Sequence, residues 1–176
     1  QEDFFIMTEF IQCSPYELAQ NPFSLIGKDW ALLTGGTLGS CNPMTVSWGG
    51  LGILWNKPVA TVYVRPQRHT FGFMESHHTF TLSFFENDPE YRKMLAFCGK
   101  ESGRTVNKWE ACGLHPITLD SGAAPAEASL VLVCRKLYAQ DLKEECFVER
   151  SVIEPNYPDK DFHRMYIGEI VACYKR

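Results

Sequence analysis

The sequence lacks the features that mark several common classes of protein. No uninterrupted apolar run approaches the roughly 20 residues that a membrane-spanning helix needs, so we expect a soluble protein. Basic residues are not in excess, since 17 Lys and Arg face 21 Asp and Glu, and this balance argues against a nucleic-acid-binding surface. Repeats and low-complexity stretches are also missing. A single domain over residues 1–176 is therefore expected, with residues 1–20 as an N-terminal extension that carries a short helix.

The cysteines lack the spacing of a metal site or a disulfide framework. There are seven of them, an odd number, and none forms a C-x-x-C pair. Several lie in apolar segments, where a reduced cysteine behaves as a small hydrophobic residue, and this usage indicates a reducing cytoplasm. The apolar stretch Phe4–Met7 has no basic flank and no long hydrophobic core, so we expect no signal peptide.

Sequence motifs for nucleotide phosphates, hydrolysis and metals are incomplete or absent. Gly50-Leu51-Gly52 lacks the third glycine of a dinucleotide-binding fingerprint, and Gly99-Lys100-Glu101 has an acid where a phosphate-binding loop needs a hydroxyl. No G-x-S-x-G elbow is present. The adjacent His77 and His78 would point in different directions on any regular element, which suits surface residues better than joint metal ligands.

The apolar patterns predict several strands with helices inserted between them. Strands are expected over residues 30–34, 44–48, 59–64, 80–85, 130–138 and 165–171. Helices are expected after Ser14-Pro15, from a cap at Thr70, from Asp88 to Cys98 and over residues 106–112. We expect loops over residues 35–40 and before residue 130, and a break in the sheet at Gly49, Gly50 and Gly52. Because no β-α-β alternation is present, the order favours a mainly β fold with peripheral helices, as a closed or split antiparallel barrel.

One polar segment has the composition of a phosphate site. Arg65-Pro66-Gln67-Arg68-His69-Thr70 follows an apolar strand and precedes a short helix. A phosphate monoester carries roughly −1.5 to −2 charges near neutral pH, and guanidinium groups, a hydroxyl and free helix N–H groups are the donors that bind it. The alternative is an arginine pair on a solvated turn. Ser102-Gly103-Arg104 offers similar donors at the start of a further expected helix.

A second segment, Cys41 to Trp48, is uncharged and rich in small polar side chains and backbone hydrogen-bonding groups. These groups suit a flat ring with polar edges. The Cys41 thiol could face such a ring or be a partly buried strand-end cysteine. Trp48 and Trp55 could stack on the ring, although aromatic residues of small barrels more often belong to the core.

Three segments together resemble the flavin reductase-like, FMN-binding split-barrel family: Asn42 to Trp48, Arg65 to Thr70, and Tyr166-Ile167-Gly168-Glu169-Ile170. The resemblance covers residues 21–170 and implies a Greek-key split β-barrel that forms a homodimer, with FMN near the interface. It implies that the isoalloxazine and ribityl chain are lined by Asn42, Pro43, Met44, Thr45, Val46, Ser47 and Trp48. The phosphate end would be held by Arg65, Pro66, Gln67, Arg68 and Thr70, with Ser102, Gly103 and Arg104 also approaching the cofactor.

The resemblance also implies a function. Members of this family often place a histidine near the nicotinamide, directly after a Gly-Asp pair. Here the order is Asp161-Phe162-His163, so His163 is either that residue or a structural histidine. The implied activity is an oxidoreductase in which NAD(P)H gives a hydride to FMN and a small molecule, free flavin or partner protein accepts the electrons, with no essential acid–base residue. The alternatives are an FMN-binding electron carrier or flavin store without NAD(P)H activity, and a barrel that binds haem, a deazaflavin or pyridoxal phosphate.

Overall fold

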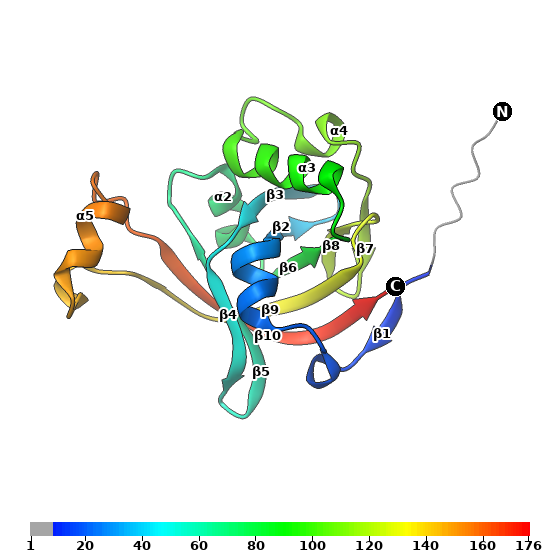
Figure 1. Cartoon of the computed structure of the whole chain (residues 1–176), viewed down its shortest axis with the longest axis horizontal. Helices are drawn as coiled ribbons and strands as arrows, with labels where there is room; N and C mark the ends of the chain where they lie inside the picture. The colour runs from blue at the N-terminus through cyan, green and yellow to red at the C-terminus, as the bar shows by residue number, and fades with distance from the viewer. Residues whose placement is uncertain (1–8) are drawn as a thin grey trace.

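Residues 9–176 are described by a computed structural model of the chain (Figure 1). Phe4–Met7, where no signal peptide is expected, lie outside the described residues. No helix in the described part of the chain is long and apolar enough to span a membrane. Most of the strands form one antiparallel sheet: β1 (Ile11–Cys13), β2 (Ala31–Thr37), β3 (Ser40–Val46), β4 (Gly49–Leu54), β5 (Lys57–Val64), β6 (Thr79–Phe84), β9 (Leu130–Asp141) and β10 (Arg164–Lys175).

The order of this sheet is β3-β2-β6-β9-β10-β5-β4, and β1 adds to β10. A separate hairpin, β7 (Pro116–Leu119) with β8 (Gly122–Pro125), lies on β6, where the Thr81 hydroxyl donates to the Ala123 carbonyl oxygen at 2.7 Å. The expectation of a mainly β fold with peripheral helices is confirmed. Over residues 9–176, no ladder joins β3 to β4, so closure into a barrel and its split Greek-key form stay predictions.

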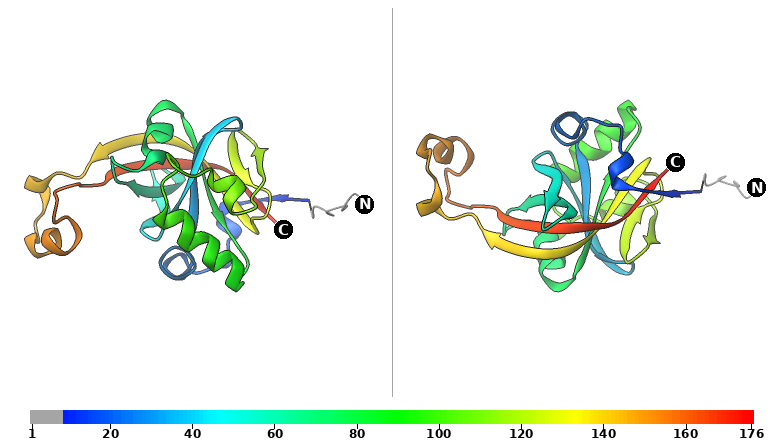
Figure 2. Two further views of the ribbon diagram at one scale, coloured as in Figure 1. Left: turned by 90° about the horizontal axis from the view of Figure 1, so that it is seen from above. Right: turned by 90° about the horizontal axis from the view of Figure 1, so that it is seen from below.

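Helices flank the sheet, and the last of them in the chain lies on an arm that projects from it (Figures 1 and 2). They are α1 (Pro22–Ser24), which continues into a π-helical turn (Leu25–Asp29), α2 (His69–Ser76), α3 (Pro89–Lys100), α4 (Lys108–Ala111) and α5 (Ile153–Asn156), with 3-10 turns at Pro15–Glu17, Glu144–Cys146 and Arg150–Val152. The expected capping box at Ser14 is present on the first 3-10 turn. Helix α3 begins as expected, because the Asp88 carboxylate accepts the Glu90 N–H at 2.7 Å.

The sheet has apolar residues on both faces. Successive side chains of a strand point to opposite sides, so Leu33 enters the main core while Leu32 faces α3. The main core contains buried Phe80, Leu132 and Tyr166 from three neighbouring strands. The second cluster packs Met94, Leu95 and Cys98 of α3 beneath Leu114. This packing fixes α3 beside β2 and β3.

Several boundaries differ from the sequence-based expectations. The expected loop over residues 35–40 is the tip of a hairpin, since β2 continues to Thr37 and β3 begins at Ser40. Gly36 has φ +100°, and a Cβ there would lie 2.1 Å from the Ser40 carbonyl oxygen, so this hairpin needs glycine. Strand β3 ends at Val46 rather than Trp48, and the glycines from Gly49 onward form β4 rather than a break. Strand β5 supplies the pairing partner of β4.

Two helix starts and one loop also differ. Arg68 is the N-cap of α2, and Thr70 lies inside the first turn. Helix α4 begins at Lys108, because the Asn107 side chain accepts the Glu110 N–H. The stretch expected to be a polar loop before residue 130 contains the β7–β8 hairpin. Between β9 and β10, residues 142–163 form an arm that projects from the sheet and carries α5 (Figure 2).

Candidate functional site

The end of β3 opens into a cavity of about 190 Å³, which we name the Trp48 pocket. It is lined by Met44, Thr45, Val46, Ser47, Trp48, Tyr63, Arg65, Arg68 and His163. Parts of the two stretches that the sequence analysis linked to a flavin, Met44 to Trp48 and the pair Arg65 and Arg68, therefore line one pocket. The expected histidine joins them from the arm.

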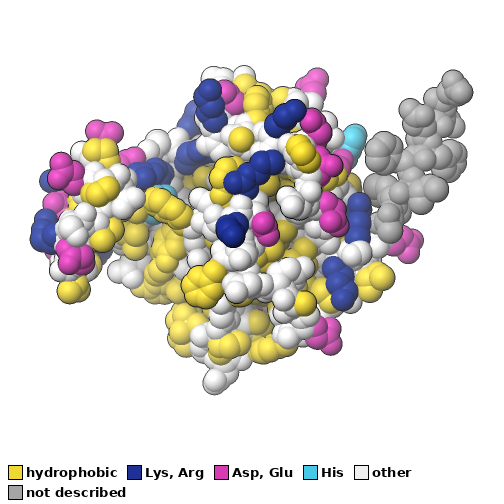
Figure 3. Space-filling model, viewed as in Figure 1, with side chains coloured by type: hydrophobic (Ala, Val, Ile, Leu, Met, Phe, Trp, Pro, Cys, Tyr) yellow, Lys and Arg dark blue, Asp and Glu magenta, His cyan; other side chains and the backbone are white. Residues whose placement is uncertain are grey.

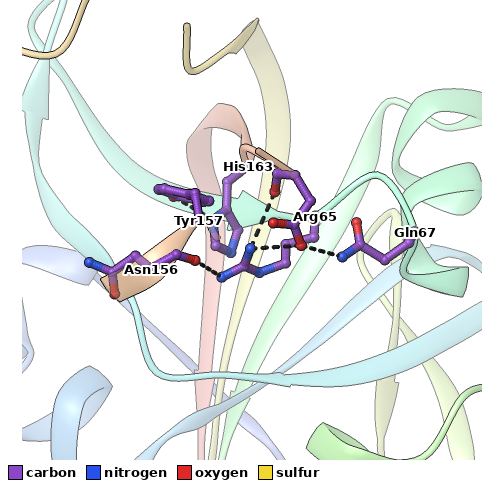
Figure 4. Close-up of polar contacts among 6 residues, drawn as sticks. Arg65, Gln67, Asn156, Tyr157 and His163 are labelled. Carbon is purple, nitrogen blue, oxygen red and sulfur yellow. Dashed lines mark hydrogen bonds and ion pairs between the residues drawn. The ribbon is translucent and has the colours of Figure 1, made fainter. Parts of the chain in front are cut away.

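Arg65 joins the end of β5 to the arm (Figure 4). Its Nη2 donates to the Asn156 carbonyl oxygen at 2.9 Å, and its Nη1 lies 2.9 Å from the Asp161 carboxylate. Gln67 donates to the same carboxylate at 2.6 Å. The hydrogen bond from Gln67, together with the Arg65 charge, lowers the pKa of Asp161. Arg65 and Gln67 thus use part of their hydrogen-bonding capacity within the protein, and the sequence analysis did not foresee their partner Asp161.

His163 is buried beside the ring of Trp48, with ring centroids 5.2 Å apart. Its Nδ1 lies 2.7 Å from the Tyr157 hydroxyl oxygen. Burial and then the nearby Arg65 charge lower the pKa of His163 to about 4. The imidazole is therefore neutral at pH 7 and can exchange a hydrogen bond with a ligand but adds no positive charge to the pocket.

Arg68 and Lys108 bind the carboxyl end of α3. Arg68 donates from Nη1 to the Gly99 carbonyl oxygen at 2.7 Å and from Nη2 to that of Cys98 at 3.2 Å. Lys108 donates to the Cys98 carbonyl oxygen at 2.8 Å and to that of Pro43 at 3.0 Å. Cations suit this end of a helix because its last carbonyl groups lack partners within the helix and carry the negative end of the helix dipole.

Lys108 supports the candidate site through its contact with Pro43 of β3, and the sequence did not predict this role. It is only 2% exposed, and burial followed by the charge of Arg68 lowers its pKa to about 8. Burial also lowers the pKa of Arg68. Nothing in the local sequence marks Lys108 as buried, since a lysine in a short helix is usually solvated. Its carbonyl partners are Cys98, ten residues earlier in the chain, and Pro43, which is 65 residues away.

A second cavity, of about 400 Å³, lies at the start of β3, and we name it the Asn42 pocket. It is lined by Cys41, Asn42, His69, Phe73, Gly103, Arg104, Thr105, Val106, Asn107 and Trp109. The buried Asn42 side chain donates to the Thr70 hydroxyl at 2.8 Å. Gly103 lies so close that a Cβ there would be 2.2 Å from the Asn42 Oδ1 atom. Most of the expected site residues are therefore divided between two pockets, lined by the parts of β3 before and after Pro43. The expected residues that line neither pocket are Pro43, Pro66, Gln67, Thr70 and Ser102.

The remaining expected residues have these positions. Arg104 donates from Nη1 to the Gln67 carbonyl oxygen at 2.7 Å, and the Ser102 hydroxyl accepts the Arg104 N–H at 3.2 Å. The Cys41 thiol lines the Asn42 pocket, and burial raises its pKa, which favours the neutral thiol. Trp48 is 49% exposed at the mouth of its pocket, so it is not a core residue. Trp55 is at the β4–β5 turn, half exposed against Tyr138, and lines neither pocket.

A larger cavity, of about 570 Å³, lies elsewhere, between the N-terminal segment, the start of α3 and the end of β10. Leu18, Phe85 and Arg92 are among its lining residues, and among the described residues none of the expected site residues contributes to it. Its size alone does not make it the functional site. The guanidinium groups of Arg65 and Arg68 and the ring of Trp48, which suit a phosphorylated ring compound, line the Trp48 pocket instead. The Thr70 hydroxyl, expected as a phosphate donor, is buried and does not line it.

Sequence comparison shows the family of the chain. The flavin reductase like domain family matches residues 26–176, so the chain belongs to this family. No curated protein sequence matches the chain.

Similar solved structures include three proteins with flavin-related names. Flavoredoxin from Methanosarcina acetivorans is 21% identical, with a TM-score of 0.63 over 84% of this chain and 68% of that one. An FMN-binding domain of flavin reductases-like enzyme from Shewanella baltica is 16% identical, with a TM-score of 0.64 over 95% and 77%. A Streptomyces globisporus NADH:FAD oxidoreductase in complex with NAD and FAD fragments is 15% identical, with a TM-score of 0.61 over 84% and 74%. At these identities the likeness shows a shared fold.

Proposed function

We propose that the chain binds FMN in the Trp48 pocket and is an NAD(P)H-dependent flavin oxidoreductase. The single observation that carries this proposal is the convergence of Ser47, Trp48, Arg65 and Arg68 on one pocket in a chain of the flavin reductase like family. When bound, FMN would accept a hydride from NAD(P)H and pass electrons to a small-molecule or protein acceptor.

The chain would bind and orient the cofactor. Thr45 to Ser47 line the pocket, and their backbone groups would form hydrogen bonds to the polar edge of the ring. The guanidinium groups of Arg65 and Arg68 would bind its phosphate. The neutral His163 and the adjacent Trp48 would shield one side of the ring from water. Asn42, Gly103 and Arg104 of the neighbouring Asn42 pocket would take part where the cofactor extends along β3.

A homodimer is part of the proposal. The Trp48 pocket, at about 190 Å³, is smaller than the roughly 300–1,000 Å³ of typical ligand pockets, so a molecule as large as FMN would project from it. A second copy of the chain could cover the projecting part. Apolar side chains for such a contact are exposed at Ile53 and Trp55 in the β4–β5 hairpin, where Figure 3 shows hydrophobic residues gathered at the lower end of the molecule. Light scattering of the purified protein would test the dimer, and a monomer at all concentrations would contradict it.

A second function is favoured by the likeness to a flavoredoxin. In this alternative the chain is an FMN-binding electron carrier or flavin store and does not react with NAD(P)H. We also propose a cytoplasmic location, which the seven free thiols support.

Two measurements separate these functions. The visible absorption spectrum with and without added FMN tests cofactor binding, and absence of binding, or a haem, deazaflavin or pyridoxal phosphate spectrum, would overturn both proposals. Anaerobic addition of NADH or NADPH to the FMN-loaded protein should bleach the flavin absorption if the chain is a reductase. If neither NADH nor NADPH bleaches the flavin absorption, the carrier remains as the function.

The placement of FMN has its own test. Charge-assisted hydrogen bonds contribute about 1.5–3 kcal/mol each, so Arg68→Ala should weaken FMN binding by about 10- to 100-fold. The variant should still fold, although it loses contacts to two carbonyl groups of α3. Arg150→Ala in the arm is the matched control, because Arg150 is exposed and pairs with Glu144. Unchanged FMN affinity in Arg68→Ala would contradict the placement.

A further inference from the structure

Two cysteine side chains face one another at the edge of the sheet, away from both candidate pockets. Strand β1 lies beside the end of β10 (Figure 1). In this ladder Cys13 is directly opposite Cys173. Their Sγ atoms are 2.9 Å apart. Opposite residues of antiparallel strands have Cα atoms about 4.5–5.5 Å apart, and disulfides span Cα separations of about 4.4–6.8 Å. The backbone therefore already holds the pair at a distance that a disulfide can bridge.

We propose that Cys13 and Cys173 form a reversible disulfide that joins β1 to β10 when the protein meets a low-molecular-weight disulfide such as glutathione disulfide. In a reducing compartment the pair stays in the dithiol form that the structure shows. The proposal concerns a modification site and does not depend on which flavin function is correct.

The difference in exposure of the two thiols decides which one reacts first in the two thiol–disulfide exchange steps. Cys13 is half-buried on a short edge strand, whereas Cys173 is fully buried. The Cys13 thiolate attacks one sulfur of glutathione disulfide, which breaks the S–S bond of the oxidant and releases one glutathione thiolate. Cys173, after losing its proton, attacks the Cys13 sulfur and expels the second glutathione thiolate. The two protein thiols thus lose two electrons and two protons, and one glutathione disulfide becomes two glutathione molecules.

A second close pair provides a competing assignment. The Sγ atoms of Cys98 and Cys112 are 3.7 Å apart. Cys98 lies in the cluster under α3 with no exposed surface, and burial, together with the neighbouring Cys112, raises its pKa to about 12. Cys98 also precedes the end of α3, where Arg68 and Lys108 hold its carbonyl oxygen. Cys112 of this pair is half-buried, as Cys13 is, and burial also raises the pKa of Cys173 to about 12, so exposure and pKa do not separate the two pairs. The separation is geometric, because the Sγ atoms are 2.9 Å apart in the Cys13–Cys173 pair and 3.7 Å apart in this one.

The disulfide would change the behaviour of the N-terminal segment. Strand β1 has only three residues and pairs with β10 alone among the described strands, so it is an edge element that opens at low cost. A disulfide between two residues 160 positions apart in the sequence strongly restricts the unfolded chain. Cys13 also lines the cavity of about 570 Å³, so oxidation would fix one wall of that cavity.

The test compares the reduced protein with protein treated with glutathione disulfide and then freed of the reagent. We expect peptide mapping by mass spectrometry without reductant to find the Cys13 and Cys173 peptides linked, with the loss of two hydrogen atoms. The melting temperature should rise by about 5–15 °C and return to its first value after dithiothreitol. Cys13→Ser should show neither the linked peptide nor the rise. Cys146→Ser, which removes an exposed thiol, should show both.

Three results would overturn the proposal. The first is that Cys13 stays a free thiol, which means that it does not attack glutathione disulfide, or stays a stable glutathione adduct, which means that Cys173 does not attack the Cys13 sulfur. The second is a linked Cys98–Cys112 peptide without a Cys13–Cys173 peptide. The third is a link between two chains through Cys13. A check of the reduced Cys13→Ser variant by circular dichroism ensures that the variant is folded, and Cys13→Ala serves as a second variant for the same comparison.

Discussion

The ammonium group of Lys108 lies 3.0 Å from the carbonyl oxygen of Pro43, the residue of β3 that separates the two candidate pockets. The same ammonium group binds the Cys98 carbonyl oxygen of α3. One buried side chain therefore ties β3 to the carboxyl end of α3. The position of Pro43 relative to Arg68, which binds the same helix end, depends on this link.

Lys108→Met should lower the free energy of unfolding by about 1–3 kcal/mol. The substitution keeps the length of the side chain but leaves two carbonyl groups without their donor. Removal of a buried charge offsets part of this cost. Chemical denaturation measures the change, and Lys93→Met is the control because the Lys93 side chain is 75% exposed and pairs with the exposed Glu90. Equal stability of the two variants would show that the Lys108 contacts contribute nothing.

Thr70→Val should destabilise the protein by about 1–3 kcal/mol, although the two side chains have nearly the same shape. Thr70 is 1% exposed, and its hydroxyl accepts the hydrogen bond of the Asn42 amide at 2.8 Å. Valine leaves that buried donor without this acceptor. Thr70→Ser keeps the hydroxyl and should lose less stability than Thr70→Val in the same thermal melts. The reverse order would mean that the methyl group matters more than the hydrogen bond.

Gly103→Ala should displace the loop that carries Ser102 and Arg104. A Cβ at position 103 would lie 2.2 Å from Asn42 Oδ1 and 2.8 Å from His69 Cδ2, both closer than atoms can pack. We expect a loss of FMN affinity of at least several-fold, measured by fluorescence titration, if this loop contacts the cofactor. Gly72→Ala is the matched control, because nothing lies within 4 Å of the added Cβ and alanine favours the helix. Unchanged affinity in Gly103→Ala would place the cofactor away from the Asn42 pocket.

The stability of the protein should fall as the pH is lowered from about 6.5 to 4, in part because of His163. The folded state lowers the pKa of this histidine to about 4, whereas an unfolded histidine has a pKa near 6.5. The unfolded state therefore binds more protons in this window, and the free energy of unfolding increases with pH there, by no more than about 3 kcal/mol from this group. His163→Asn should reduce the slope in urea denaturation at each pH, and an identical slope would contradict the assignment.

The sequence predicted the parts of the fold that depend on local pattern. Helix α3 was predicted from Asp88, Pro89 and its apolar face, and β5 from its β-branched alternation. Strand β4 was not predicted, because Gly49, Gly50 and Gly52 have low strand propensity and pair only because β5 is opposite them. The β7–β8 hairpin was missed for a similar reason, since its strands have four residues each and pack on β6.

The candidate site was predictable in its residue types but not in its internal contacts. Arg65 and Arg68 have the charge and position of phosphate ligands, yet the structure also gives them carbonyl and carboxylate partners. Those partners lie in the arm and at the end of α3, so only tertiary structure brings them together. The division of Asn42 and Trp48 between two pockets likewise follows from packing against distant segments.

The position of β10 in the sheet has a consequence for the order of folding. This strand pairs with β1, β5 and β9, and it is synthesised after all three. Until it leaves the ribosome, β5 and β9 have no common partner and the halves of the sheet on either side of β10 stay apart. The nascent chain therefore carries unpaired strand edges until β10 is synthesised, and β10 then joins the two halves of the sheet in a long-range step.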